Sequence, residues 1–161
     1  MTLRIALSAL VASLMISSEA HAQTMVRKAG ANLDAPGIYK LADEIDGLGL
    51  PGGEPVVTIS SAGVTFDLDG HTIRAGVGRP AILVAVGAAD ADTTAGATEV
   101  VVRNGRIVRG QSGIALNRVN ETVTNLRIDG VELLHQRMNA INIDGGGKVA
   151  ITNTRIVDAV N

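Results

Sequence analysis

The chain has 161 residues, a formal net charge of −2 and no cysteine. The lack of cysteine excludes disulfides and Cys-ligated metal sites, and the near-neutral charge excludes the basic surface that nucleic-acid binding requires. With one tyrosine, one phenylalanine and no tryptophan, the chain also has almost no aromatic faces on which bases or sugar rings could stack.

The first 22 residues have the pattern of a secretory signal peptide. Arg4 is followed by an apolar run, Ile5–Ile16, and then by the small-x-small site Ala20-His21-Ala22. The apolar run is too short to span a bilayer, which disfavours the alternative of a retained membrane anchor. We therefore expect export to the periplasm or the extracellular space, cleavage before Gln23 and no stable membrane insertion.

The remaining residues predict an all-β domain. Valine, isoleucine and threonine are frequent, apolar residues tend to alternate, and no helical periodicity of useful length occurs. We expect residues 23–55 to form a capping region and first strand, including a strand at Gly37–Leu41, and residues 56–161 to form repeats. The small, polar stretch 87–98 predicts a loop, and Val131–Leu134 predicts a further short strand.

A six-residue pattern recurs along the repeats: apolar, any, Asn, any, Arg, Ile. Another short apolar segment precedes each copy, so one unit reads as two strands joined by turns. Stacked units of this kind bury a continuous interior, which predicts a parallel β-helix of about four rungs. The copies are Val102–Ile107, Val123–Ile128 and Ile151–Ile156, with Leu68–Ile73 as an incomplete copy, and the other strands are Val57–Ile59, Ile82–Val84, Ile114–Leu116 and Ile141–Ile143.

Three phrases of the sequence resemble the opening coils of one known superfamily. These are Gly63–Ile73, Val101–Ile107 and Ser112–Leu116, which are similar to coils of the right-handed parallel β-helix proteins of the pectate-lyase-like superfamily. The resemblance implies the right-handed form of the β-helix and a ladder of stacked asparagines at one turn. It does not select an activity, because this fold hosts lyases, hydrolases, epimerases, adhesins and non-enzymatic modules.

The last rung has no polar cap after its final strand. This pattern leaves three interpretations open: a chain truncated at its C-terminus, end-to-end self-association with another copy, or a frayed last rung.

Equivalent residues of successive rungs are expected to form columns about 4.8 Å apart. We expect two inward apolar columns, one ladder of turn amides and one outward column of arginines. Their members are Val102, Val123 and Ile151 after Leu68; Ile73, Ile107, Ile128 and Ile156; Asn104, Asn125 and Asn153; and Arg106, Arg127 and Arg155.

The arginine column is the candidate substrate-binding surface. Either Arg106, Arg127 and Arg155 are solvated and paired with nearby carboxylates such as Asp129 and Asp158, or they form a ladder for an anionic polymer. In the second case the partner is an acidic polysaccharide.

The candidate catalytic residues are Asp67, Asp69 and His71. Two carboxylates two residues apart on a strand share one face, where they could act as an acid/base pair or hold Ca²⁺, and His71 could transfer a proton. The alternative is that Asp69-Gly70 only forms a turn. No other cofactor is predicted and no transition-metal site, since residues 23–161 hold two histidines and no cysteine.

These observations favour an exported module that binds or processes acidic polysaccharide through an outward face of the solenoid. If it is an enzyme, a polysaccharide lyase or a related carbohydrate-active enzyme is expected. The alternatives are a non-catalytic structural or surface-interaction segment and a periplasmic accessory module.

Overall fold

The computed structural model describes residues 23–86, 98–117, 124–144 and 148–158. The expected signal peptide and its cleavage site, most of the expected loop at 87–98, and Val123 of the second repeat lie outside the described residues.

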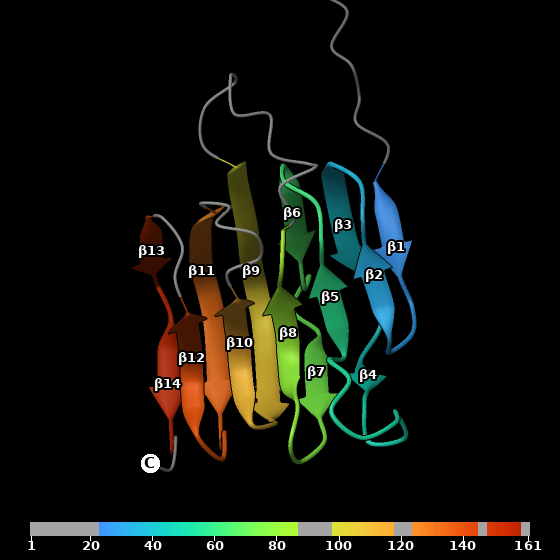
Figure 1. Cartoon of the computed structure of the whole chain (residues 1–161), viewed down its shortest axis with the longest axis vertical. Coiled ribbons are helices and arrows are strands. Elements are labelled where there is room, and N and C mark those ends of the chain that lie inside the picture. Colours follow the sequence, from blue (N-terminus) through green and yellow to red (C-terminus); the bar gives the residue numbers. More distant parts are fainter. Residues whose placement is uncertain (1–22, 87–97, 118–123, 145–147, 159–161) are drawn as a thin grey trace, which may run out of the picture.

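The described residues form an all-β parallel solenoid of about 4 turns, as the repeats predict. Figure 1 shows the strands side by side, from β1 at one end of the stack to β13 and β14 at the other. The described part of the chain contains no helix, and so none long and apolar enough to cross a membrane. The strands are β1 (Thr24–Val26), β2 (Ala31–Leu33), β3 (Gly37–Leu41), β4 (Ile45–Asp46), β5 (Val57–Ile59), β6 (Val64–Asp67), β7 (Thr72–Ala75), β8 (Pro80–Val84), β9 (Thr98–Arg109), β10 (Ser112–Asn117), β11 (Thr124–Leu134), β12 (Asn139–Asp144), β13 (Val149–Thr152) and β14 (Arg155–Val157).

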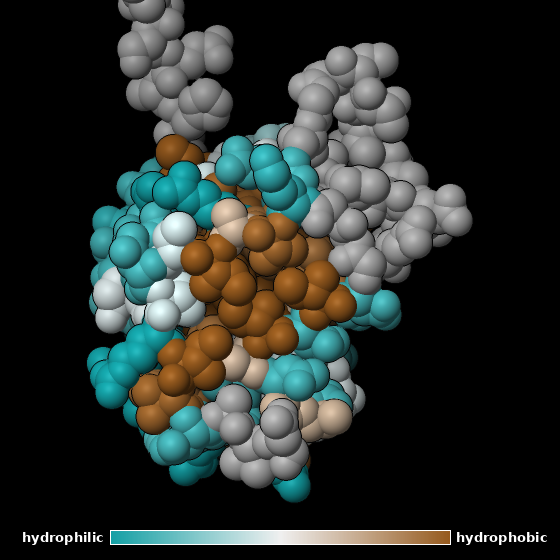
Figure 2. All heavy atoms as spheres, turned by 90° about the vertical axis from the view of Figure 1, so that its left-hand side faces the viewer, coloured by the Kyte–Doolittle hydropathy of each residue, from teal (hydrophilic) through white to brown (hydrophobic). Residues whose placement is uncertain are grey.

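The strands form three faces around the core. The first face contains β1, β3, β6, β13 and the first halves of β9 and β11; the second contains β4, β7, β14 and the second halves of β9 and β11. The third face is a separate sheet in the order β12-β10-β8-β5-β2. All of its pairings are parallel. Aliphatic side chains fill most of the interior between the three faces. Figure 2 shows apolar side chains between the faces at the β13–β14 side of the stack.

In the rungs of β9, β11 and β13–β14, the corner between the first and second faces is a single residue in the left-handed conformation. Asn104 in β9 has a φ of 57°, Gly130 in β11 has 65°, and Asn153 between β13 and β14 has 51°. Asparagine and glycine are the residues that tolerate this conformation best. The bend lets β9 and β11 run continuously through both faces, so the expected strand Val131–Leu134 is the second half of β11.

The register of the second repeat differs from the one predicted. Val102 pairs with Ile128 and Ile107 with Leu133, whereas the repeat predicted Val123 and Ile128 at these positions. The corner of this rung is therefore Gly130 and not Asn125. The prediction was wrong because glycine meets the left-handed requirement as well as asparagine, while Ile128 and Leu133 fill the same inward columns.

The first and third copies do occupy equivalent positions. Ile151 pairs with Ile128, and Ile156 pairs with Leu133. Ile73 also pairs with Ile107, as predicted, but Phe66 and not Leu68 pairs with Val102, because the β6–β7 turn is longer than the corner in β9. One inward column therefore runs Phe66, Val102, Ile128, Ile151, and the other runs Ile73, Ile107, Leu133, Ile156.

Substitutions at Gly130 distinguish the two registers. In the observed register, Gly130→Val forces a β-branched residue into the left-handed region and should cost about 1–2 kcal/mol, while Gly130→Asn should be nearly neutral. If position 130 were an ordinary strand position, valine would be the better residue. Urea unfolding of the two variants checks this order, and a more stable valine variant would contradict the observed register.

Candidate functional site

The turn from β6 to β7 holds the predicted catalytic carboxylates in ion pairs. Asp67 is only 7% exposed. Its Oδ2 lies 2.9 Å from Arg103 Nε, and its Oδ1 accepts the Asp69 amide at 2.9 Å. Asp69 Oδ2 lies 2.8 Å from Lys40 Nζ. Each carboxylate thus lies beside its own cation.

The same turn contains His71. Its backbone amide donates to Leu68 O at 2.8 Å, and its carbonyl accepts the Arg106 amide at 3.0 Å. His71 is half-buried. Across the described ranges, no group of three or more His, Asp or Glu side chains is placed to hold a metal ion. Catalysis by Asp67, Asp69 and His71, with or without Ca²⁺, remains a prediction.

The three arginines do not form one column, which corrects the prediction. Glu132 pairs with both Arg106 and Arg155 in the strand register, so it lies between them. Its Oε2 lies 2.7 Å from Arg106 Nε and its Oε1 lies 3.0 Å from Arg155 Nη1. The Arg106 hydrogen bond, together with the charges of both arginines, lowers the pKa of Glu132.

Arg127 lies on the first face, away from the column that Arg106, Glu132 and Arg155 form, which we call the Glu132 ladder. Its Nη2 lies 3.0 Å from Asp129 Oδ2. Asp129 also accepts Asn153 Nδ2 and Thr152 Oγ1 at 2.9 Å each, and the Asn153 bond is the largest of the contacts that lower the pKa of this carboxyl. All three arginines are therefore paired with carboxylates, as the first of the two interpretations of these residues expected.

The predicted ladder required the turn asparagines to bond to one another, but two of them, Asn104 and Asn153, bond to carboxylates instead. Asn104 Nδ2 lies 3.4 Å from both carboxylate oxygens of Asp67, and Asn153 Nδ2 bonds Asp129 in the same way. In both cases the amide reaches back to an aspartate of the preceding rung. The third member, Asn125, uses its Oδ1 to accept the Lys148 amide at 2.9 Å.

Acid should weaken the Glu132 ladder. A carboxyl whose pKa is lowered by folding contributes stability above its ordinary value, 4.5 for glutamate, and this stability is lost as the pH falls through the folded pKa. Thermal unfolding from about pH 7 to about pH 3 should show Glu132→Gln less stable than the parent at neutral pH, with the difference between them shrinking as the pH falls. A constant difference across this range would contradict the ladder.

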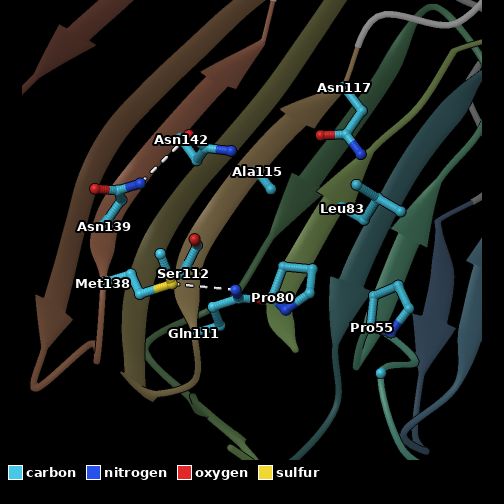
Figure 3. Close-up of a pocket in the computed structure, with 11 residues that line it drawn as sticks. Pro55, Pro80, Leu83, Gln111, Ser112, Ala115, Asn117, Met138, Asn139 and Asn142 are labelled. Atoms are coloured by element: carbon cyan, nitrogen blue, oxygen red, sulfur yellow. Dashed lines mark hydrogen bonds between the residues drawn. The ribbon is translucent and has the colours of Figure 1, made fainter. Parts of the chain in front are cut away.

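A polar hollow lies on the outward side of the third face (Figure 3). It encloses 390 Å³ and crosses β8, β10 and β12. Ser112 and Ala115 on the middle strand are small and form its floor. In the strand register they lie between Pro80 and Leu83 on one side and Asn139 and Asn142 on the other. The other lining residues are Gly53, Pro55, Gln111, Asn117 and Met138.

The side chains around the hollow are amides and aliphatic groups. Asn139 Nδ2 lies 3.4 Å from Asn142 Oδ1, and Gln111 Nε2 lies 3.1 Å from Met138 Sδ. A second, smaller hollow of 200 Å³ shares Gln111 and Met138 with it and is also lined by Arg137. One guanidinium thus lies beside an otherwise uncharged surface.

Sequence reasoning missed this hollow. The signal was present at the outward positions of the predicted strands, namely Ala115 between Ile114 and Leu116, and Asn142 between Ile141 and Ile143. Neither residue type is unusual on its own. Their juxtaposition depends on the pairing of β10 with β12.

Comparisons of the chain with protein-family models, curated proteins and solved structures found no match. Function must therefore be inferred from the fold and from the surfaces described above.

Proposed function

We propose that this chain is an exported polysaccharide-binding module of the pectate-lyase-like β-helix type, which holds a glycan across the outward hollow of the third face. The observation that carries the proposal is the lining of this hollow. An apolar wall, Pro80 and Leu83, faces an amide wall, Asn139 and Asn142, across a floor of small residues. A sugar ring has an apolar C–H face and polar edges, and side-chain amides can both donate to and accept from its hydroxyls.

The charge distribution favours a glycan that carries carboxylates. Arg137 is exposed beside the hollow, and a guanidinium suits bidentate contact with a carboxylate. Arg106, Arg127 and Arg155, the binding residues predicted from sequence, are each held by a carboxylate on other faces. A role for them in binding would require a polymer that displaces Glu132 or Asp129.

Binding without turnover is the simpler proposal. Asp67 and Asp69 are paired with Arg103 and Lys40, which supports a structural role for both carboxylates in the turn. A lyase acting on uronates would nevertheless be recognised by an unsaturated product that absorbs in the ultraviolet.

Calorimetric titration with oligogalacturonate and with a neutral oligosaccharide tests the proposal. Asn142→Ala should weaken binding about 3- to 10-fold, the loss of one hydrogen bond, and Ala115→Phe should abolish binding by filling the floor. Arg137→Ala should reduce only the preference for the acidic glycan. The matched control is Asn32→Ala, an amide on β2 of the same sheet but outside the hollow.

Two results would contradict the proposal. One is binding that Ala115→Phe does not change. The other is a loss in Arg127→Ala equal to that in Asn142→Ala, which would place the glycan on the first face.

A further inference from the structure

The guanidinium of Arg79 is buried without a counter-ion. Arg79 lies in the turn between β7 and β8 and is 5% exposed. Its Nη2 donates to Leu50 O at 2.9 Å, but among the described residues Nε and Nη1 have no hydrogen-bond partner. No ion pair between described residues includes Arg79. Such a cation is costly to the fold, because it has lost its hydration and gained no opposite charge.

The connection that holds this guanidinium is longer than its equivalents in the other rungs. It joins β4 to β5 over residues 47–56, whereas the same corner takes residues 76–79, 110–111 and 135–138 in the later rungs. We call it the β4–β5 loop. Among the described residues, the bond from Arg79 to Leu50 O is the only hydrogen bond that joins residues 48–55 to another rung.

One apolar side chain anchors the β4–β5 loop. Leu50 is half-buried against the core, and its Cδ2 would lie 3.4 Å from a Cβ built on Gly30. Leu48, on the same loop, is 57% exposed. A segment with so few hydrogen bonds and buried contacts opens at a lower free energy than the sheets it joins.

The β4–β5 loop also borders the hollow of the third face. Gly53 and Pro55 are among the residues that line this hollow, and so is Pro80, which directly follows Arg79. The Arg79 carbonyl accepts the amide of Gln111, another lining residue, at 2.7 Å. The guanidinium thus belongs to a residue at the margin of the hollow and bonds to the loop that forms one edge of it.

We propose that Arg79 is a carboxylate-binding residue of this hollow, which becomes accessible when the β4–β5 loop moves away from it. The proposal rests on the glycan-binding function proposed above and adds the residue that selects a uronate. Two nitrogens of a guanidinium can donate parallel hydrogen bonds to one carboxylate. A bound uronate would therefore supply the counter-ion that Arg79 lacks.

Calorimetric titration of the full chain with oligogalacturonate and with a neutral oligosaccharide tests the proposal. Arg79→Met keeps the aliphatic stem and removes the charge. It should weaken binding of oligogalacturonate about 10- to 100-fold, the loss of hydrogen bonds to a charged group, and leave binding of the neutral glycan unchanged. In about 1 M salt this loss should persist, whereas the effect of Arg137→Ala should fade, because Arg137 is exposed.

Leu50→Ala and Leu48→Ala form a matched pair that tests the movement of the loop. Leu50→Ala should strengthen binding of oligogalacturonate about 3- to 10-fold, because less of the binding energy is used to open the loop. Leu48→Ala should bind like the parent. The gain in Leu50→Ala should disappear when Arg79→Met is added, because it depends on access to the guanidinium.

Urea unfolding separates a binding role of Arg79 from a structural one. Arg79→Met should be at least as stable as the parent, since it removes a buried charge that has no partner. A less stable Arg79→Met variant that binds both glycans equally weakly would show a structural role and overturn the proposal. An unchanged preference for the acidic glycan, or a Leu50→Ala variant that binds no more tightly than Leu48→Ala, would also overturn it. A parent that binds neither glycan would instead contradict the glycan-binding function itself, and this inference with it.

Discussion

Replacing Gly105 by alanine should destabilise the solenoid by at least about 3 kcal/mol, because there is no room for a side chain at this position. A Cβ built on Gly105 would lie 2.3 Å from Leu68 Cβ and 2.8 Å from His71 O. Leu68 is fully buried, and His71 O accepts the Arg106 amide that ties the β6–β7 turn to β9. Neither group can move without breaking the contact between these two rungs.

Gly52→Ala is the matched control. A Cβ at Gly52 meets nothing within 4 Å, so the same chemical change is free of contact there. Urea unfolding followed by far-ultraviolet circular dichroism should show a large loss of stability for Gly105→Ala and almost none for Gly52→Ala. Equal midpoints for the two variants would show that the turn and β9 are not packed as described.

The second large effect is expected at Phe66, one of the largest side chains in the core. It is fully buried on β6 and pairs with Tyr39 on one side and Val102 on the other. Phe66→Ala removes a whole ring from a close-packed column and should cost about 3–5 kcal/mol. This is a large part of the roughly 5–15 kcal/mol that stabilises an ordinary domain.

Phe66→Leu keeps most of the volume and should cost about 1 kcal/mol. Comparing the alanine and leucine variants separates the cost of the cavity from the cost of losing the aromatic ring. A leucine variant as unstable as the alanine variant would mean that contact with Tyr39, and not the filled volume, dominates at this position.

The architecture of this chain was predictable because its periodicity is strong. The expected strand at Gly37–Leu41 is β3, and the expected short strands at Val57, Ile82, Ile114 and Ile141 lie in β5, β8, β10 and β12. Alternating aliphatic residues need an interior to face, and a stack of parallel rungs provides one for every strand.

The register of the second rung was not predictable from the same pattern. Val123–Ile128 and Ile128–Leu133 both place aliphatic residues five positions apart, so both satisfy the apolar columns. The difference lies at the corner, where glycine and asparagine are both acceptable. Choosing the more conspicuous repeat placed Arg127 in a column that Glu132 occupies.

The hollow on the third face was beyond sequence reasoning for another reason. Its walls come from three strands, β8, β10 and β12, that are separated in the chain by β9 and β11 and their connections. Serine, alanine, leucine and asparagine at outward positions suggest only a solvent-facing surface until the pairing brings them together.

The alternation of Arg106, Glu132 and Arg155 also has a consequence for how the chain folds. The rungs that begin at Val102 and Ile151 are so similar that β13 and β14 could dock directly on β9 and leave out β11. The aliphatic columns would tolerate this error, but Arg155 would then lie against Arg106, about 4.8 Å away, without the intervening carboxylate. Like charges at this spacing penalise the misassembled stack and select against it. The alternating charges therefore favour the correct order of rungs over a stack that skips β11, which the similar aliphatic columns alone would discriminate against less.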